Sequence, residues 1–343
     1  MRSDATGPSA LSRSSGSGTP STAGQRPRIG VSSCLLGEPV RYNGGHCRNR
    51  FLTDVLGRHV EWVAICPEAE IGLGTPRETL RLERTDAPSG AQPRVRATKS
   101  GTDHTDAIRN VADAHLAVLR TLDGYVLKNK SPSCGLFGLP VFEEGKRVDG
   151  KGRGGFAARL LDLCPELPAE EEGRLTDADL CEHFVERVFA HARLRALLES
   201  AWRPRDLIDF HARHKLQLLS HSPQGARSLG RIVTEAGTGE RSDIAADYTA
   251  AFHSVLATPT SPGKHVNALQ HAFGMVSGYL DDSRRHDILA AIDDYRAGHV
   301  PLTLPLSLIR HHCNAERVAW ASQQTYLAPF PTDLGLRNQL PRK

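Results

Sequence analysis

Three cysteines that each follow a short apolar run constrain the fold of this 343-residue chain most strongly. Cys34, Cys66 and Cys134 each lie within a few residues of such a run, and each run has the composition of a buried strand. In an open α/β sheet, ligands collect outside the carboxyl ends of the strands. We therefore expect the three thiols to converge on one site, which favours a three-cysteine metal or iron–sulfur site.

The spacing of these cysteines leaves a second interpretation open. No C-x-x-C pair is present, and free cysteine is often only a small buried hydrophobic residue. A glycine or proline lies within three residues of each cysteine, which allows the backbone to approach an inorganic group closely. From the residues alone, the two interpretations are about equally supported.

Composition indicates an ordinary globular protein of about two domains. Hydrophobic residues make up 39% of the chain and charged residues 24%, and the net charge of +4 does not by itself indicate nucleic-acid binding. The seven cysteines are scattered and odd in number, which favours a reducing compartment. With no long apolar run and no apolar N-terminal signal, we expect a cytoplasmic protein with no membrane contact.

The pattern along the chain predicts an α/β domain followed by an all-α domain. The expected parts are a disordered extension at 1–27, the α/β domain at 28–199, a helical domain at 200–330 and a flexible tail at 331–343. The α/β domain should contain an open, mostly parallel sheet with flanking helices. Residues 1–27 are rich in Ser, Gly, Thr and Pro and poor in large apolar side chains, which is typical of disorder.

Apolar periodicity and capping residues predict the individual elements. The expected strands are 29–32, 61–65, 79–82 and 124–128. The expected helices are 103–122, 156–163, 176–189, 206–220, 244–256, 265–278, 284–297 and 307–321.

Three polar groups could serve chemistry beside the cysteines. Glu68, two residues after Cys66, is placed for proton transfer, although it could instead accept hydrogen bonds from the loop. Ser131 could orient water or substrate, although Ser-Pro is more often turn chemistry. Arg41, Tyr42 and Asn43 offer a cation, an aromatic face and an amide, as a nucleobase pocket needs, but Asn43 followed by glycine is also a plain turn signal.

The other four cysteines differ in how well they could serve as ligands. Cys47 lies near Cys34 in sequence and is a possible extra ligand. Cys164 repeats the Cys-Pro-Glu tripeptide at the end of a helix, where we expect no site. Cys181 should be core, and Cys313 follows two histidines too closely for all three residues to face one ion.

The helical half carries a one-sided, histidine-rich set of basic residues that could bind RNA phosphates. A solvated helix face is the plainer explanation of such charge. The candidates are His211, Arg213, His214, Lys215 and Arg231.

Four ordered motifs resemble those of the thiouracil desulfidase family. They are 33–37 with 40–46, 66–68, 71–77 and 130–135, within a resemblance that covers roughly residues 28–170. The second half, from 207–211 through 229–231, resembles the helical domain fused to this module in bacterial desulfidases that act on thiolated tRNA.

This resemblance implies a 4Fe–4S cluster held by Cys34, Cys66 and Cys134, with Glu68 as acid/base and Ser131 assisting. The implied reaction converts 4-thiouridine in tRNA to uridine and releases sulfide without consuming electrons. Cys47 has no counterpart in the family. The alternatives are desulfidation of free thiouracil-type bases and a non-catalytic zinc or thiol module in a nucleic-acid-binding protein. The sequence indicates no oligomeric state.

Overall fold

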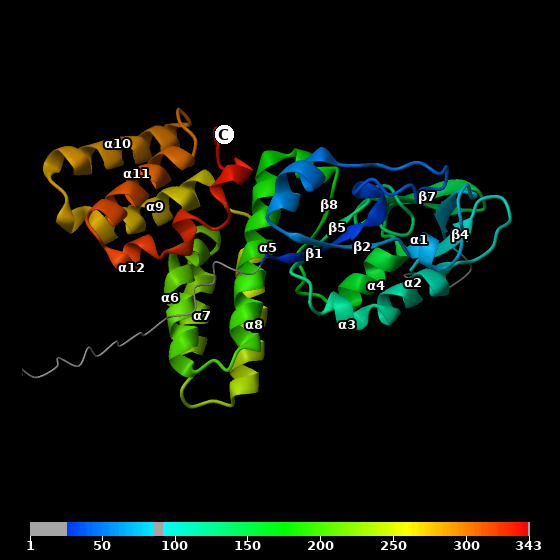
Figure 1. Ribbon diagram of the computed structural model, residues 1–343, viewed down its shortest axis with the longest axis horizontal. Helices are drawn as coiled ribbons and strands as arrows, with labels where there is room; N and C mark the ends of the chain where they lie inside the picture. The colour runs from blue at the N-terminus through cyan, green and yellow to red at the C-terminus, as the bar shows by residue number, and fades with distance from the viewer. Residues whose placement is uncertain (1–25, 85–91, 342–343) are drawn as a thin grey trace, which may run out of the picture.

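The long helix α5 (Ala178–Glu199) stands between the two halves of the molecule in Figure 1. The computed structural model describes residues 26–84 and 92–341, so nearly all of the predicted disordered extension lies outside the described residues. Strands and short helices lie on one side of α5, and helices alone lie on the other. The predicted fold class, α/β followed by all-α, is confirmed.

The first half is built on a fully parallel sheet with strand order β2-β1-β5-β8. Its strands are β1 (Arg28–Ser32), β2 (Glu61–Ile65), β5 (Gly124–Leu127) and β8 (Ala169–Glu171). The predictions for β1, β2 and β5 are confirmed to within one residue at each end. Because these three strands are parallel neighbours, their carboxyl ends meet at one edge of the sheet.

Side chains of this sheet alternate between two covered faces. One face packs on α5 through Ile29, Val31, Val126, Phe184, Val185 and Val188. The other packs on α2 (Thr105–Ala114) and α4 (Gly155–Leu163) through Ile65, Tyr125, Leu127, Ile108, Val111, Phe156 and Leu160. Helix α5 can approach closely at Gly124, where a Cβ atom would lie 2.6 Å from Val188 Cγ2.

A second, mixed sheet with strand order β4-β3-β6-β7 was not predicted. Its strands are β3 (Leu80–Glu83), β4 (Arg94–Ala97), β6 (Leu139–Glu143) and β7 (Lys146–Gly152). The expected strand 79–82 is β3, which therefore belongs to this sheet rather than to the parallel one. Leu82, Val95 and Val141 of this second sheet pack in the same hydrophobic core as the parallel sheet.

The helices of the second half follow most of the predicted segments. They are α6 (Pro204–His221), α7 (Pro223–Thr234), α8 (Arg241–Ala257), α9 (Pro262–Val276), α10 (Asp282–Ala297), α11 (Thr303–Ala315) and α12 (Ala319–Ser322). The predicted helix 103–122 is divided into α2 and α3 (Leu116–Leu119). Helix α5 runs ten residues beyond the predicted 189, and α7 was not predicted.

Helix α5 contributes to the cores of both halves. Its first turns pack on the parallel sheet, whereas Ala190 and Leu194 pack with Tyr248 and Phe252 of α8. The predicted boundary near residue 200 falls in the connection between α5 and α6.

The prediction of a flexible tail from residue 331 is wrong for the residues up to Arg337. Leu334 and Arg337 are both buried, and Arg337 forms ion pairs with two carboxylates of α5. Residues 342–343 lie outside the described residues. Among the described helices, none combines the length and the apolar character that a bilayer-spanning segment needs.

Candidate functional site

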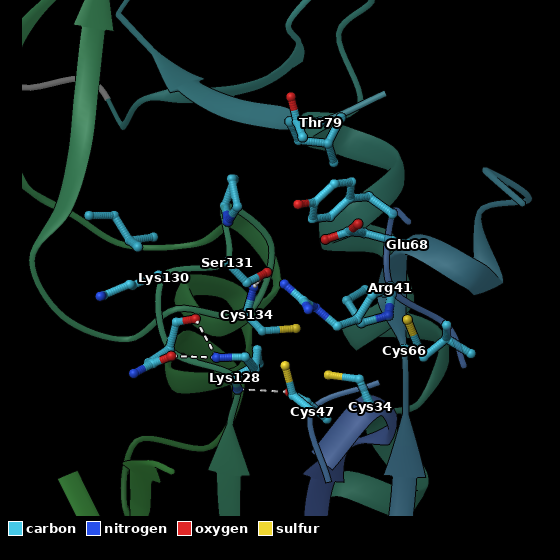
Figure 2. Close-up of a pocket in the computed structure, with 18 of the residues that line it drawn as sticks. Cys34, Arg41, Cys47, Cys66, Glu68, Thr79, Lys128, Lys130, Ser131 and Cys134 are labelled. Atoms are coloured by element: carbon cyan, nitrogen blue, oxygen red, sulfur yellow. Dashed lines mark hydrogen bonds between the residues drawn. The ribbon is translucent and has the colours of Figure 1, made fainter. Parts of the chain in front are cut away.

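A cavity of about 420 Å³ opens at the carboxyl ends of β2, β1 and β5. Cys34, Cys66 and Cys134 all line it, and Figure 2 shows their sulfur atoms directed into the same space. The predicted convergence of the three strand-end thiols is therefore confirmed. All three cysteines are free thiols in the structure.

The turns after β1 and β2 place the first two thiols. Cys34 lies in the short 3-10 turn Ser33–Leu35, which begins directly where β1 ends. Cys66 immediately precedes α1 (Pro67–Glu70), and two backbone N–H groups of that helix donate hydrogen bonds to its sulfur. Proline at the first position of α1 starts the helix without an unused N–H group.

A tight loop braced by the start of α4 places the third thiol. The sulfur of Cys134 is hydrogen-bonded to the hydroxyl of Ser32 at the end of β1. The carbonyl oxygen of Ser133 accepts the backbone N–H of Phe156 at 2.9 Å. The loop and α4 approach so closely at Gly154 that a Cβ atom there would lie 2.5 Å from the Ser133 oxygen. The loop that carries Cys134 is thus fixed by backbone contacts.

Burial raises the pKa of all three thiols. The pKa of Cys34 rises to about 12, and that of Cys134, which is the more deeply buried, rises well above its ordinary value. After burial, the neighbouring thiol of Cys47 raises the pKa of Cys34 most, while the ammonium of Lys128 lowers it. The pKa of Cys66 is also raised by burial, against the two hydrogen bonds from α1. Burial therefore favours the protonated form of each thiol, and positive charge bound in the cavity would favour the thiolate.

Within residues 26–84 and 92–341, no group of three or more His, Cys, Asp or Glu side chains is arranged to hold a single metal ion. The three thiols nevertheless face the same cavity.

Glu68 points into the cavity and is firmly held. Arg77 donates to Glu68 Oε2 through Nη2 at 2.7 Å and Nε at 3.0 Å, and Ser133 Oγ donates to Oε1 at 2.9 Å. The two ion-paired side chains are only 6% and 16% exposed. Glu70, by contrast, bonds the imidazole of His115 outside the cavity. The sequence did not predict that Arg77 and Ser133 would orient the carboxylate.

Ser131 combines a turn contact with a place on the cavity wall. Its Oγ accepts the backbone N–H groups of Cys134 at 3.1 Å and Ser133 at 3.3 Å, which is the turn chemistry of a serine before proline. Its hydroxyl proton takes no part in these contacts and remains available for a group in the cavity.

Lys128 at the end of β5 is a cavity residue that the sequence did not single out. Its Nζ lies 2.5 Å from Glu172 Oε1 and also contacts the side chain of Asn129. Glu172 follows β8, the edge strand beside β5, and its other oxygen accepts the backbone N–H of Asn129 at 2.6 Å. Lys128 and Glu172 therefore form a fixed ion pair beside the cysteines, in which the ammonium lowers the pKa of Cys34 and the carboxylate raises it.

Two of the three residues predicted to form a nucleobase pocket line the cavity. Arg41 and Tyr42 line the cavity, with the Arg41 guanidinium 5.5 Å from the centre of the Tyr42 ring and Tyr42 itself exposed. Asn43 is not among the lining residues. Its Oδ1 accepts the backbone N–H of Gly45 at 3.1 Å, so it serves the turn.

The predicted RNA-binding set of the helical half is wrong for His214. This side chain is buried, its ring stacks on Phe210 at 4.0 Å, and its Nδ1 contacts the Phe210 carbonyl oxygen at 2.8 Å. The two residues lie one helical turn apart on the apolar face of α6. His211 is half-buried, with Nδ1 3.2 Å from the Tyr248 hydroxyl. Arg213 is also half-buried, whereas Lys215 and Arg231 are exposed.

The remaining cysteines separate clearly. Cys47 lines the cavity together with the three strand-end thiols. Cys181 and Cys313 are buried in hydrophobic clusters, as expected for Cys181, and Cys164 packs at the edge of a third.

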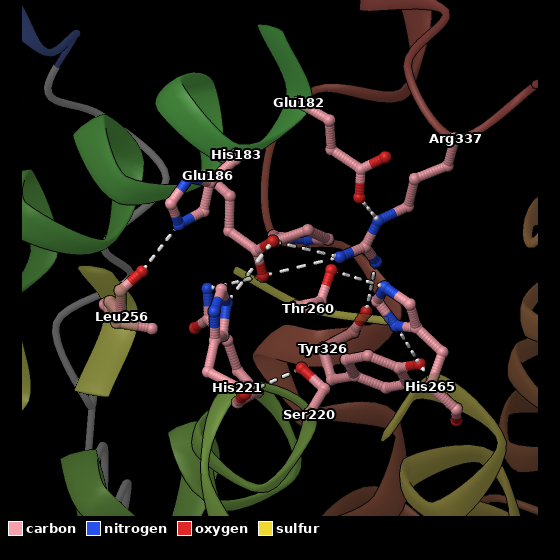
Figure 3. Close-up of polar contacts among 12 residues, drawn as sticks. Glu182, His183, Glu186, Ser220, His221, Leu256, Thr260, His265, Tyr326 and Arg337 are labelled. Carbon is pink, nitrogen blue, oxygen red and sulfur yellow. Dashed lines mark hydrogen bonds and ion pairs between the residues drawn. The ribbon is translucent and has the colours of Figure 1, made fainter. Parts of the chain in front are cut away.

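A second cavity, of about 190 Å³, lies among α5, the start of α9 and the C-terminal segment, residues 335–341. Figure 3 shows the network of polar contacts around it. Arg337 pairs with Glu182 at 2.7 Å and Glu186 at 3.3 Å, and Gln217 Nε2 donates to Glu186 at 2.8 Å. Burial alone would raise the pKa of Glu186, but Arg337 and His221 hold it below its ordinary value. The network joins the C-terminal segment to α5.

Two family models match separate parts of the chain. Residues 29–172 match a family described as 2-thiouracil desulfurase, and residues 215–331 match DUF1722, a family of unknown function. The first match contains the strand-end thiols, Glu68 and the Lys128 pair. The second begins within α6 and ends before the C-terminal segment.

Two curated relatives and one solved structure resemble the chain. "Uncharacterized protein YbgA" of Escherichia coli is 33% identical over 156 residues, which is 44% of this chain and 90% of that protein. "Uncharacterized protein YbbK" of Bacillus subtilis is 34% identical over 128 residues, 36% of this chain and 83% of that protein. The structure of the 4Fe-4S-dependent thiouracil desulfidase TudS is 30% identical and covers 46% of this chain and 98% of TudS. The TM-score between the two structures is 0.36.

Proposed function

Because the chain belongs to the 2-thiouracil desulfurase family, we propose that it is a desulfidase acting on thiolated uracil, with 4-thiouridine in tRNA as its substrate. The reaction replaces the thiocarbonyl sulfur by the oxygen of water and releases hydrogen sulfide, so no electron is consumed. The observation that carries the proposal is the convergence of three strand-end thiols and one oriented carboxylate on a single cavity.

The donor set fits a 4Fe–4S cluster better than a single ion. Three thiols are soft ligands for iron, and they surround a cavity of about 420 Å³ rather than a point. Cys34, Cys66 and Cys134 would hold the cluster. When bound, it would supply an iron that none of these three cysteines holds and that could bind soft sulfur and polarise a C=S bond.

Glu68 is the proposed acid/base group. Its carboxylate takes a proton from the water that adds to the ring carbon, and Arg77 and Ser133 keep it aimed into the cavity. Ser131 donates its free hydroxyl proton to the substrate base, while its oxygen holds the loop that carries Cys134. Lys128 supports negative charge that develops on the substrate.

The charges around the cavity favour RNA over a free thiobase. Among the described lining residues Glu68 is the one acidic side chain, and five lining residues are basic: Arg41, Arg77, Arg81, Lys128 and Lys130. In the described part of the chain, Arg41 and Lys130 form no ion pair, so both remain available for phosphates next to the thiolated base. The exposed basic residues of α6 and α7 would add phosphate contacts. The thiolated base would leave its stack to enter the cavity.

The decisive experiment is anaerobic reconstitution with iron and sulfide, followed by incubation with thiolated tRNA or with free 4-thiouracil. We expect loss of 4-thiouridine, equal gain of uridine and released sulfide, with a steep decrease at higher salt. Turnover of the free base alone would favour the alternative of free thiouracil-type substrates. A preparation with tetrahedral zinc, no iron and no labile sulfide would instead indicate the non-catalytic thiol module.

Charge reversal tests the RNA contact. Lys130→Glu should lower turnover of thiolated tRNA at least about tenfold at low salt, because it replaces a phosphate contact by repulsion. Turnover of a free thiolated nucleoside should change much less. Lys146→Glu, an exposed site on β7, is the matched control.

A further inference from the structure

A fourth thiol, Cys47, shares the cavity with the three strand-end cysteines. We infer that Cys47 is a fourth ligand of the bound cluster. It would coordinate the remaining iron while no substrate is present, and the sulfur of the substrate would displace it. This inference rests on the proposed function.

Backbone contacts hold Cys47 beside Cys34. The Cys47 N–H donates to the carbonyl oxygen of Cys34 at 2.9 Å, and the Asn49 N–H donates to Leu35 at 2.9 Å. These two hydrogen bonds place the segment 47–49 directly against the turn that carries Cys34. In Figure 2 the sulfurs of Cys47 and Cys34 face the same space as that of Cys134. Cys47 is therefore within reach of any group that Cys34 binds.

The surroundings of Cys47 differ from those of the core cysteines. Cys181 and Cys313 are buried in hydrophobic clusters, and neither lines the cavity that holds the other thiols. Cys47 is half-buried, lies between the polar residues His46 and Arg48, and borders a cavity with three other thiols. Clustered thiols in such a position are more often ligands than packing groups.

The loop that carries Cys47 also carries the substrate contacts proposed for Arg41 and Tyr42. It is tied to the cavity wall by Arg77, whose N–H donates to the Tyr42 carbonyl oxygen at 2.7 Å and whose Nη2 donates to Val40 at 2.9 Å. Entry of the substrate beside Arg41 and Tyr42 therefore occurs next to Cys47. The exchange replaces one sulfur donor by another, and the released Cys47 thiolate takes a proton from water, so no electron is transferred.

The test compares wild-type protein with Cys47→Ala and Cys47→Ser after anaerobic reconstitution. Iron and sulfide content should be retained in both variants, because three thiol ligands remain. Graded oxidation with ferricyanide should then remove one iron about tenfold faster in the variants, seen as the electron paramagnetic resonance signal of a 3Fe–4S cluster. A small added thiol should perturb the spectrum of the variants but not that of the wild type. Cys164→Ala, outside the cavity, should behave as wild type.

The outcomes separate this inference from the proposed function. Equal rates of iron loss and equal responses to the small thiol in wild type and variants would overturn the role of Cys47 while leaving the three-cysteine cluster intact. Loss of all iron from Cys47→Ser would also contradict it, because Cys47 would then be one of the three essential ligands. Wild-type protein that binds no cluster would contradict the proposed function itself.

Discussion

At the scale of single residues, the site depends on how Glu68 is held. Arg77 and Ser133 bind both carboxylate oxygens, so the group keeps one orientation toward the cavity. We predict that Glu68→Gln binds the cluster normally but lowers kcat by about 10²–10⁴-fold, because the amide keeps the shape and cannot accept the proton. Iron content and single-turnover rates with thiolated tRNA measure the two effects separately.

Glu70→Gln is the matched control for this prediction. Glu70 is two residues away on the same helix, but it bonds His115 and does not line the cavity. Its replacement should leave kcat within about twofold of the wild type, since exposed ion pairs contribute little. Full activity of Glu68→Gln would show that another group moves the proton.

The cysteines of the site can be predicted from the sequence more readily than the charged and polar residues that surround them. Each cysteine follows an apolar run, and that local pattern was enough to predict their convergence at the sheet edge. Lys128 and its partner Glu172 are 44 residues apart, and each directly follows a strand that meets the other only in the folded sheet. No local pattern marks such a pair. The same holds for Ser133 and Glu68, whose contact spans 65 residues.

At the scale of elements, the contact between the Cys134 loop and the start of α4 sets the position of a ligand. A Cβ atom at Gly154 would meet the Ser133 oxygen at 2.5 Å and the Cys134 nitrogen at 2.9 Å, both of them backbone atoms that cannot rotate away. We predict that Gly154→Ala destabilises the fold by about 1–3 kcal/mol and displaces the loop. Iron content after reconstitution should decrease more than the helix content measured by circular dichroism.

Gly263→Ala provides the comparison, since nothing lies within 4 Å of its Cβ position near the start of α9. This change should leave thermal stability unchanged or raise it slightly, because alanine favours helix. If Gly154→Ala bound iron as fully as Gly263→Ala, the close backbone contact would not control the ligand loop.

The elements that were predicted incorrectly depend on contacts with residues distant in sequence. The periodicity of 103–122 is helical throughout, but the helix is interrupted at His115, which Glu70 of α1 holds at 2.7 Å. Strand β7 is rich in charged residues and glycine, and β8 has only three residues, so neither shows strand alternation. Their pairing partners, rather than their own sequences, make them strands.

At the scale of the whole molecule, α5 and the C-terminal segment join the two halves. The same helix packs on the parallel sheet and on α8, and Arg337 binds two of its carboxylates. The buried polar groups of the helical half include His214 and His265. Burial lowers the pKa of each to about 3. Their ordinary value is 6.5, so the folded state prefers both as neutral imidazoles.

These lowered pKa values predict that the helical half loses stability in acid. Between pH 6.5 and about 3 each of these histidines is protonated in the unfolded chain but neutral in the folded chain. The free energy of unfolding is therefore greatest above pH 6.5 and falls as the pH decreases. Each such histidine contributes about 1.4 kcal/mol per pH unit in that window. His214→Phe, which keeps an aromatic ring against Phe210, should reduce the slope by up to one proton in urea unfolding measured across the window. The same substitution at the exposed His286 of α10 should leave the slope unchanged. An unaltered slope in His214→Phe would mean that other groups control the acid sensitivity of this half.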